Sequence, residues 1–344
     1  MEVFEKYKNV IAKALNNDSM QTRDITKSFS EGRLYDSVGK ENYTVDAYLQ
    51  DRKTLKLSDT SLQTISSNLG VTIIQEPEIG QHPDFKHLKG TTDTEDHYIV
   101  SAFVDIKNST GLFKKYDNRT VYIITNAIQL LAINISSMLG GFVQRLQGDG
   151  VFIYFGRKGL NEGRATLHAL TALSLFTYFI KNDVRTLFEQ KGLDPIYTRI
   201  GVDFGGMNEV LWAMAGINDI SEIATYSLHT SLASKMQSYA KSNQIIIGKN
   251  VVDTACLDGT LYKPVDEKRY IFEDRDRSFY YGQFIFEWNT FLSKQSFLTT
   301  SYNTGRIEVK PEERFPVYAQ KSEALKATAA TNKPFYNDRI RFEK

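Results

Sequence analysis

An apolar strand, a long helix and two strands joined by a tight turn follow one another between residues 98 and 155, and this succession constrains the fold most. The strand is the run from Tyr98 to Val104. The helix spans 118–139, because its apolar residues recur at spacings of three and four until two glycines stop it. The two strands flank the sequence Gln147-Gly-Asp-Gly150. This order predicts a sheet with a helix packed on it.

A carboxylate stands at the end of each strand segment. Asp105 follows the first strand, and Asp149 lies in the turn of the strand pair. A folded sheet can bring both to one point, where two hard oxygen ligands suit Mg²⁺ or Mn²⁺ carrying a nucleotide polyphosphate. Each motif alone has a plainer explanation. Asp-Gly is an ordinary hairpin turn, and an Asp after a buried strand often only caps a loop.

Together the two motifs resemble the class III nucleotidyl cyclases, the adenylyl and guanylyl cyclase family. The family pattern Asp-Ile-x-x-Ser/Phe-Thr is matched by Asp105-Ile-Lys-Asn-Ser-Thr110, and its Gly-Asp hairpin by Gly148-Asp149. The resemblance implies two Mg²⁺ or Mn²⁺ ions held by Asp105, Asp149 and the Ile106 carbonyl. The turn with Ser109 and Thr110 would offer backbone N–H groups to the polyphosphate. The alternative for these two residues is simple helix capping.

The remaining elements predict an α+β fold, a ferredoxin-like split βαβ core with an antiparallel sheet. The expected elements are a helix at 161–190, strands at 195–205 and near 210–214, a helix at 228–240, a strand at 244–248 and a closing hairpin of 269–272 with 279–288. We expect three parts: a mostly helical extension at 1–95, the cyclase domain at 96–290 and a C-terminal extension docking on it at 291–344. Two apolar stripes mark the first part, Phe4/Tyr7/Ile11/Leu15 and Leu62/Ile65/Leu69.

The helix at 228–240 departs from the family pattern Asn-x-x-x-Arg. Matching Leu232-Ala-Ser-Lys-Met236 to the family's Val-Ala-Ser-Arg-Met places Ser231 at the ribose-binding Asn and Lys235 at the Arg that meets transition-state charge. Lysine keeps the charge but loses the bidentate fork. Thr230 or His229 are alternatives for the missing Asn, and Lys235 is otherwise a solvated helix lysine.

Base-reading positions match neither purine class of the family. They hold Arg145 and Ala224, where the resemblance expects Lys with Asp or Thr for ATP, or Glu with Cys for GTP. An arginine fork suits the oxygen-rich edge of a smaller base, and the chain looks most like the bacterial pyrimidine nucleotide cyclases of anti-phage (Pycsar) systems. These make cyclic CMP or cyclic UMP from CTP or UTP, and the sequence leaves that choice open. The alternative for Arg145 is a surface ion pair.

The resemblance also implies a head-to-tail homodimer with both active sites at the interface, and a product that acts on a separate effector protein. Rival interpretations are an adenylyl or guanylyl cyclase, a catalytically degenerate nucleotide-binding domain, and a diguanylate cyclase. A diguanylate cyclase would need a Gly-Gly-Asp/Glu-Glu-Phe hairpin, whereas Gly148-Asp-Gly-Val stands here.

The amino-acid composition limits the partners and the cellular location that we expect. With 42 basic and 41 acidic residues, the chain has no basic excess that would indicate nucleic-acid binding. Its one cysteine, Cys256, excludes an intrachain disulfide and favours the cytoplasm. The apolar-rich stretch 168–180 is too short to cross a bilayer, so no membrane partner is expected.

Overall fold

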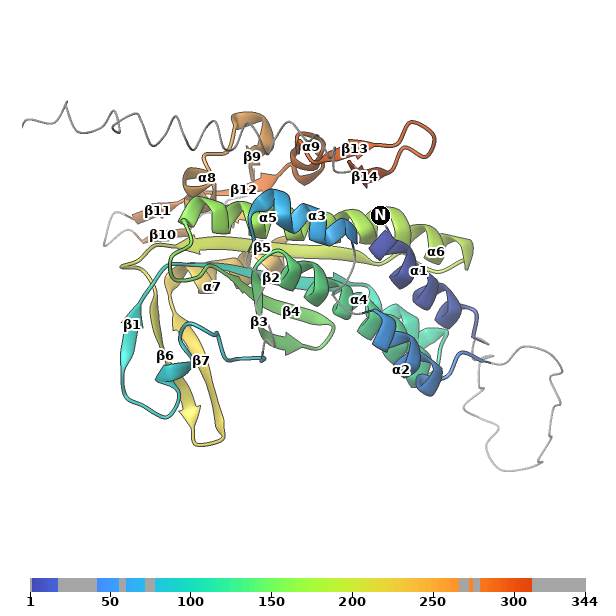
Figure 1. Ribbon diagram of the computed structural model, residues 1–344, viewed down its shortest axis with the longest axis horizontal. Helices are drawn as coiled ribbons and strands as arrows, with labels where there is room; N and C mark the ends of the chain where they lie inside the picture. The colour runs from blue at the N-terminus through green and yellow to red at the C-terminus, as the bar shows by residue number, and fades with distance from the viewer. Residues whose placement is uncertain are drawn as a thin grey trace, which may run out of the picture. The chain divides into compact units, whose positions relative to one another are not determined.

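The structure is a computed structural model that describes residues 2–17, 42–55, 60–71, 78–265, 272–274 and 279–310. Residues Met1–Val309 form one compact unit. Its centre is a seven-stranded sheet with the strand order β3-β4-β2-β5-β8-β12-β9 (Figure 1). The strands are β3 Gly141–Gln147, β4 Gly150–Phe155, β2 Ile99–Lys107, β5 Tyr197–Gly205, β8 Gln244–Gly248, β12 Gln283–Phe286 and β9 Tyr262–Pro264.

The sheet is mixed. Strands β5 and β8 run parallel, with Arg199 opposite Gln244, whereas the other neighbouring pairs in this sheet are antiparallel. A parallel pair needs a crossover connection, and helix α7 (Leu228–Tyr239) supplies part of it. The predicted α+β fold is confirmed, with this one parallel pair added to the antiparallel sheet that the sequence predicted.

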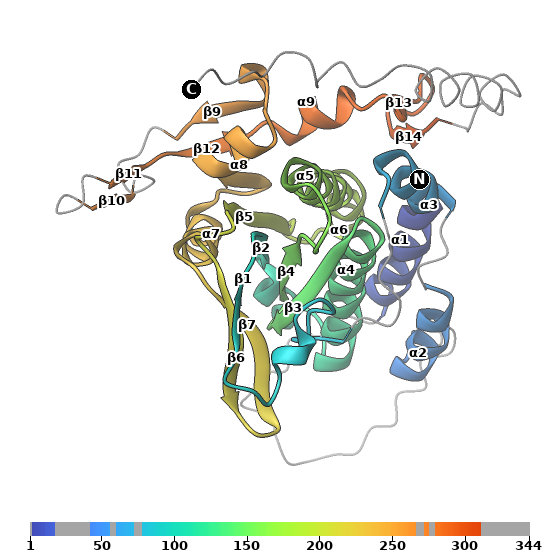
Figure 2. The same cartoon turned by 60° about the vertical axis from the view of Figure 1, so that its left-hand side comes forward.

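Strand alternation divides the side chains of β2 and β5 between two layers. Val100, Ala102 and Val104 join the main core with helices α4 (Asn118–Met138) and α5 (Glu162–Phe179). The alternate residues face α7, where Ser101 hydrogen-bonds Thr230 at 2.9 Å. Figure 2 shows α7 on one side of β2 and β5, with α4 and α5 on the other. Asp105 has the same parity as Ser101 and therefore lies in the α7 layer.

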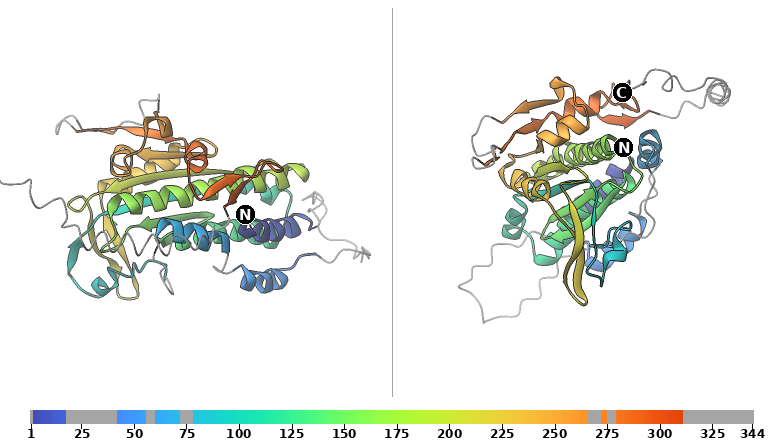
Figure 3. Two further views of the ribbon diagram at one scale, coloured as in Figure 1. Left: turned by 45° about the horizontal axis from the view of Figure 1, so that its top comes forward. Right: turned by 90° about the vertical axis from the view of Figure 1, so that its left-hand side faces the viewer.

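Two long helices form the layer opposite α7. The helix predicted at 161–190 is present as three consecutive elements: α5, a π-helical turn η3 (Ile180–Val184) and α6 (Arg185–Gln190). Together they lie along the sheet in Figure 3. Helix α4 begins and ends within a residue of the prediction. It is long and apolar enough to cross a membrane by length and composition, yet 72% of its apolar window is buried inside the protein, as in a core helix.

Three N-terminal helices lie beside this layer: α1 Glu2–Leu15, α2 Val45–Thr54 and α3 Thr60–Leu69. The predicted stripe of α1 is buried in the main core, from Phe4 to Leu15, and Asn134 of α4 donates to the Leu55 carbonyl at 2.8 Å. The N-terminal helices thus share a core with α4. The boundary at 95/96 remains a prediction.

A long β-hairpin leaves the main sheet. It consists of β6 (Leu211–Ile217) and β7 (Ile220–Tyr226), joined on one edge by β1 (Thr94–Asp96), and it projects away from the body in Figure 1. Sequence analysis expected part of β6 but neither β7 nor β1. The polar stretch 89–96, which leads into the predicted cyclase domain, ends in a paired strand, because Thr94 lies opposite Ala213.

The remaining elements close the unit. They are β10 Phe272–Asp274, β11 Phe279–Tyr281, β13 Leu298–Thr300, β14 Ile307–Val309, α8 Lys249–Thr254, α9 Trp288–Ser293 and the short 3₁₀ turns η1 Lys86–Leu88, η2 Ser109–Lys114 and η4 Gly259–Leu261. Strands β10 and β11 pair at the place of the expected closing hairpin, but β12, the rest of its second strand, pairs with β8 and β9 in the main sheet instead. Residues 269–271 of that hairpin and 311–344 of the predicted C-terminal extension lie outside the described residues.

Candidate active site

Two glycines set Asp149 beside the end of β2. Gly148 has a φ of +61°, in the left-handed region that glycine adopts without cost. A Cβ on Gly150 would lie 2.8 Å from the Val104 carbonyl oxygen, so only glycine lets the turn approach β2 this closely. The sequence Gly-Asp-Gly is therefore needed for proximity to Asp105 as well as for the turn.

Ser109 links the two acidic motifs. Its hydroxyl donates a hydrogen bond to Asp149 Oδ2. The Ser109 Oγ also lies 3.4 Å from the carbonyl oxygen of Ile106. Ser109 is the first residue of η2, and the cap position before it is held by Asn108 (φ 72°), whose side chain makes no capping hydrogen bond. Thr110 follows it and is exposed. The Ser109 hydroxyl thus orients the Asp149 carboxylate toward the Ile106 carbonyl, which the family resemblance implies is a metal ligand.

Arg199 is a site residue that sequence reasoning missed. It lies on β5 directly opposite Asp105, and its Nε donates to Asp105 Oδ2 at 2.9 Å. A side chain opposite a motif residue can be found only once the strand register is known. The guanidinium adds a fixed positive charge where an anionic polyphosphate would approach.

The donor set suits a hard divalent cation. Burial raises the pKa of the Asp149 carboxyl above its usual value, and the charge of Asp105 raises it further against the hydrogen bond from Ser109. A carboxylate whose proton affinity is raised by a neighbouring negative charge will also attract a cation. Among the described residues, no group of three or more His, Cys, Asp or Glu side chains forms a metal cage. Asp105, Asp149 and the Ile106 carbonyl would leave coordination positions for phosphate oxygens, as in Mg²⁺ sites.

A cleft of about 270 Å³ opens beside Asp105, between the β3–β4 hairpin and α7. Phe103 and Phe152, stacked with ring centroids 4.0 Å apart, form part of its wall. Helix α7 lines the cleft with Ser234, Gln237 and Ser238.

The two predicted α7 residues, Ser231 and Lys235, are exposed and do not line this cleft. Ser231 donates to the Ser227 carbonyl within its own helix at 3.2 Å. The alternatives for the missing Asn are occupied in the fold. His229 is buried against Asp203, and the Thr230 hydroxyl bonds Ser101 and Thr225. Within one subunit, neither Ser231 nor Lys235 is therefore among the residues that form the wall of the Asp105 cleft.

Arg145 forms an ion pair with Glu222 of β7, mainly through Nη2 and Oε1. The regular alternation expected around it is interrupted, because a β-bulge shifts the register between Val143 and Arg145. Its hydrogen bonds are to Glu222, so the structure does not join it to Asp105 or Asp149. Ala224 lies two residues beyond Glu222 on the same face of β7.

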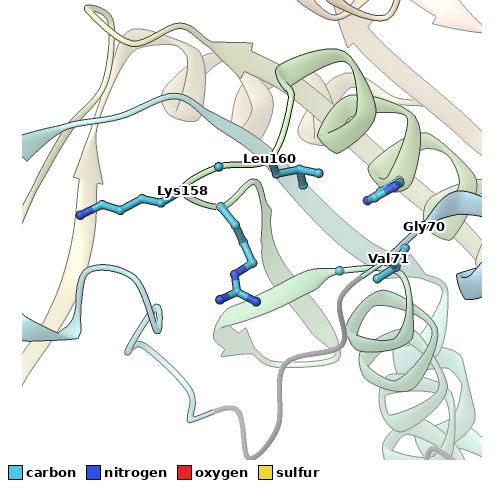
Figure 4. A pocket seen from close by; sticks show the side chains of 8 residues that line it. Gly70, Val71, Lys158 and Leu160 are labelled. Atoms are coloured by element: carbon cyan, nitrogen blue, oxygen red, sulfur yellow. The ribbon is translucent and has the colours of Figure 1, made fainter. Parts of the chain in front are cut away.

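A second cavity, also of about 270 Å³, lies between Gly70, Val71 and Leu160. Its cations are already engaged: Arg157 pairs with Asp84, and Lys158 pairs with Glu95 and extends away from Gly70 and Val71 (Figure 4). Asp105 and Arg199 line the other cleft together with Gln147 and Gly150, the residues on either side of the Gly148-Asp149 turn, so we assign the nucleotide site to the Asp105 cleft.

Comparisons with known proteins find similar sequences among curated proteins. Over 228 residues, 64% of this chain, the sequence is 40% identical to a cytidylate cyclase of Staphylococcus aureus, and over 231 residues, 63% of this chain, it is 35% identical to one of Escherichia coli. These matches cover 53% and 50% of those proteins, so the chain spans about half the length of the curated relatives it matches. No protein-family model matches the chain.

Solved structures give partial similarities. An adenylyl cyclase from P. aeruginosa matches 56% of this chain and 95% of its own, with 16% identity and a TM-score of 0.48. A guanylyl cyclase matches 57% of this chain and 93% of its own, with 16% identity and a TM-score of 0.45. The sequence matches confirm the resemblance to the nucleotide cyclases. The relatives that carry it are named cytidylate cyclases.

Proposed function

We propose that this protein is a metal-dependent cytidylate cyclase that converts CTP to 3′,5′-cyclic CMP and pyrophosphate. The observation that carries the proposal is that Ser109 bridges Asp149 and the carbonyl of Ile106, the residue next to Asp105, in a chain that is 40% identical over 228 residues to a cytidylate cyclase. The relatives' name favours CTP over UTP, the alternative that the sequence left open.

In the reaction the ribose 3′-oxygen attacks the α-phosphorus, the bond to the β-phosphate oxygen breaks, and the 3′-hydroxyl proton is lost. Two bound Mg²⁺ or Mn²⁺ ions would lower the pKa of that hydroxyl and neutralise charge on the phosphoryl oxygens. Asp105 and Asp149 would hold the ions, and Ser109 fixes the orientation of Asp149. Arg199 keeps Asp105 in place and offers positive charge to the polyphosphate.

A homodimer completes the site in this proposal. Lys235 would meet the charge of the α-phosphoryl group and Ser231 the ribose, and both are exposed on α7 outside the Asp105 cleft of their own subunit. A partner subunit is therefore the natural source of these residues. The β6–β7 hairpin offers an apolar surface for such a partner, because Ile217 and Ile220 at its tip are 68% and 83% exposed.

A role in defence against phage and a separate effector protein that binds the cyclic nucleotide rest on the resemblance alone. A cytoplasmic location rests on the single cysteine of the sequence.

The test is to incubate the purified chain with each of CTP, UTP, ATP and GTP and Mn²⁺, and to resolve the products by mass. We expect cyclic CMP as the main product, formed at least tenfold faster than any other cyclic nucleotide. Cyclisation of ATP or GTP with CTP inert would return the chain to the purine cyclases. No product from any nucleotide would favour a catalytically degenerate domain.

A further inference from the structure

The ion pair between Arg145 and Glu222 joins two elements that are far apart in sequence, β3 and β7. Its exposure is unequal: 59% of the Arg145 side chain is exposed, but only 24% of Glu222. The guanidinium has five N–H donors, so an interaction with one carboxylate leaves donors for a ligand. Glu222 in turn has acceptor positions beyond those used by Arg145. The pair therefore presents a donor and an acceptor side by side.

Glu222 is held in position by its surroundings. Gln144, the extra residue of the bulge, donates from Nε2 to the Ile223 carbonyl at 2.8 Å and so ties β3 to β7. Gly80 lies against the other side: a Cβ there would be 3.3 Å from Glu222 Cβ. The Ile223 N–H also donates to the Gly80 carbonyl at 2.9 Å. Contacts on both sides of the strand restrict where the carboxylate can move.

Small side chains surround Glu222 on its face of the hairpin. Ala215 lies directly opposite it on β6, and Ala213 lies opposite Ala224. Residues opposite each other or two apart share a face of a β-hairpin, so these three alanines lie on the Glu222 side. Methyl groups leave room for a flat ring beside the carboxylate and supply no polar atom that would compete with it.

A donor beside an acceptor matches the edge of cytosine. Cytosine donates from its 4-amino group and accepts at N3 and O2, whereas uracil accepts at O4 and donates at N3. Carboxylates accept from the cytosine amino group in nucleic-acid recognition for the same reason. Adenine has a similar amino edge, so the pair separates amino bases from oxo bases and does not by itself separate CTP from ATP.

We propose that Glu222 is a specificity-determining residue, which accepts a hydrogen bond from the 4-amino group of cytosine while its partner Arg145 donates to N3 or O2. The inference rests on the proposed cyclase function and adds the residue that makes CTP preferred over UTP. The family resemblance assigned recognition of the base on β7 to Ala224. The proposal assigns it instead to Glu222, two residues earlier on the same face of the strand.

The test is the substitution Glu222→Gln, measured as kcat/KM for CTP and for UTP. A glutamine amide can donate to uracil O4, so the ratio of CTP to UTP should fall at least tenfold, about the value of one charge-assisted hydrogen bond. Glu222→Asp keeps the acceptor on a shorter side chain and should retain a preference for CTP. The matched control is Glu189→Gln, which removes the charge of another Arg–Glu pair, with Arg185 on α6, and should leave the ratio unchanged.

A binding measurement separates failure of this inference from failure of the proposed function. Competition of CTP and UTP for the same variants, with Ca²⁺ in place of Mn²⁺, reports base preference without turnover. If the wild type cyclises CTP and Glu222→Gln keeps its CTP preference within twofold, Glu222 does not read the base and the cyclase function stands. If there is no turnover but CTP binds in preference to UTP through Glu222, the cyclase function is wrong and the recognition stands. Binding of neither nucleotide overturns both.

Discussion

At the scale of single residues, the candidate site depends on two carboxylates, Asp149 held by Ser109 and Asp105 held by Arg199. Asp149 is partly buried and accepts from Ser109, while Asp105 accepts from Arg199. Each carboxylate thus keeps one oxygen engaged by the protein. This arrangement limits the motion of the carboxylates before a metal binds, and preorganised ligands of this kind make the metal chemistry possible.

Asp105→Asn or Asp149→Asn should reduce cyclic CMP formation by about three orders of magnitude or more, because each keeps the side-chain volume and removes a charged metal ligand. Turnover with Mn²⁺ and product mass are the measurements. Asp253→Asn is the matched control, since it removes a half-exposed carboxylate that pairs with Lys249 on α8. More than a few per cent of wild-type activity in either site variant would show that the residue is not a ligand.

Sequence could predict Asp105 and Asp149 because short motifs place them at strand ends. It could not find Arg199, whose position opposite Asp105 follows from the register of β2 and β5. It also could not find Glu222, because the pair with Arg145 depends on a bulge that breaks the alternation on which the prediction relied. Residues joined by tertiary register leave no local signal in a single sequence.

At the scale of elements, α7 is anchored by a buried polar cluster. Asp203 of β5 is fully buried and accepts from His229 Nδ1 at 2.9 Å and from the Tyr281 hydroxyl at 2.6 Å. Glu209 lies 3.4 Å from the other ring nitrogen of His229. The cluster fixes the first turn of the helix that carries Ser231 and Lys235.

This anchor should make stability depend on pH. Burial alone would lower the pKa of His229, but the hydrogen bond and charge of Asp203 outweigh it, with help from Glu209, and raise that pKa above 6.5. A raised histidine pKa stabilises the folded state fully below pH 6.5, and this stability is lost as pH rises through the folded-state value. The free energy of unfolding should therefore fall above pH 6.5, by at most about 1.4 kcal/mol per pH unit.

Urea denaturation between pH 6 and 9 measures this dependence. His229→Gln should be less stable and should show a flatter pH profile in this range, whereas the exposed His87→Gln should follow the wild type. Parallel profiles for wild type and His229→Gln would mean that this imidazole carries no charge in the folded protein.

Elements with strong periodicity were predictable, and elements defined by pairing were not. Helix α4 follows from its apolar spacing and its terminating glycines, and the π-helical turn η3 does not interrupt the predicted long helix. Strand β7 was missed because its residues alternate weakly between buried and exposed, with both faces partly exposed in a hairpin that leaves the sheet. Strand β1 is polar and short, so only its partner β6 defines it.

At the scale of the whole molecule, the proposed site is divided between two copies of the chain. In one subunit Asp105 lines the cleft, while Arg145 is engaged with Glu222 and Lys235 is exposed on α7 and does not line the cleft. The apolar residues exposed on the β6–β7 hairpin, Leu211, Ile217, Ile220 and Tyr226, would be covered in a dimer. A two-fold symmetric dimer makes its two sites identical, so each subunit gives one half to each site.

Complementation between damaged subunits tests this division. Asp105→Asn and Arg145→Ala proteins, each poorly active alone, should recover about a quarter of wild-type activity when equal amounts exchange subunits. The reason is that about half of the dimers are then mixed, and each mixed dimer has one intact site and one doubly damaged site. Mixing Asp105→Asn with Asp149→Asn is the matched control, because both ligands belong to the same half of the site and no mixed dimer regains a complete one. No recovery in the test mixture after confirmed exchange would place Arg145 and Asp105 in the site of a single subunit. Recovery in the control mixture would mean that Asp105 and Asp149 of one site come from different subunits.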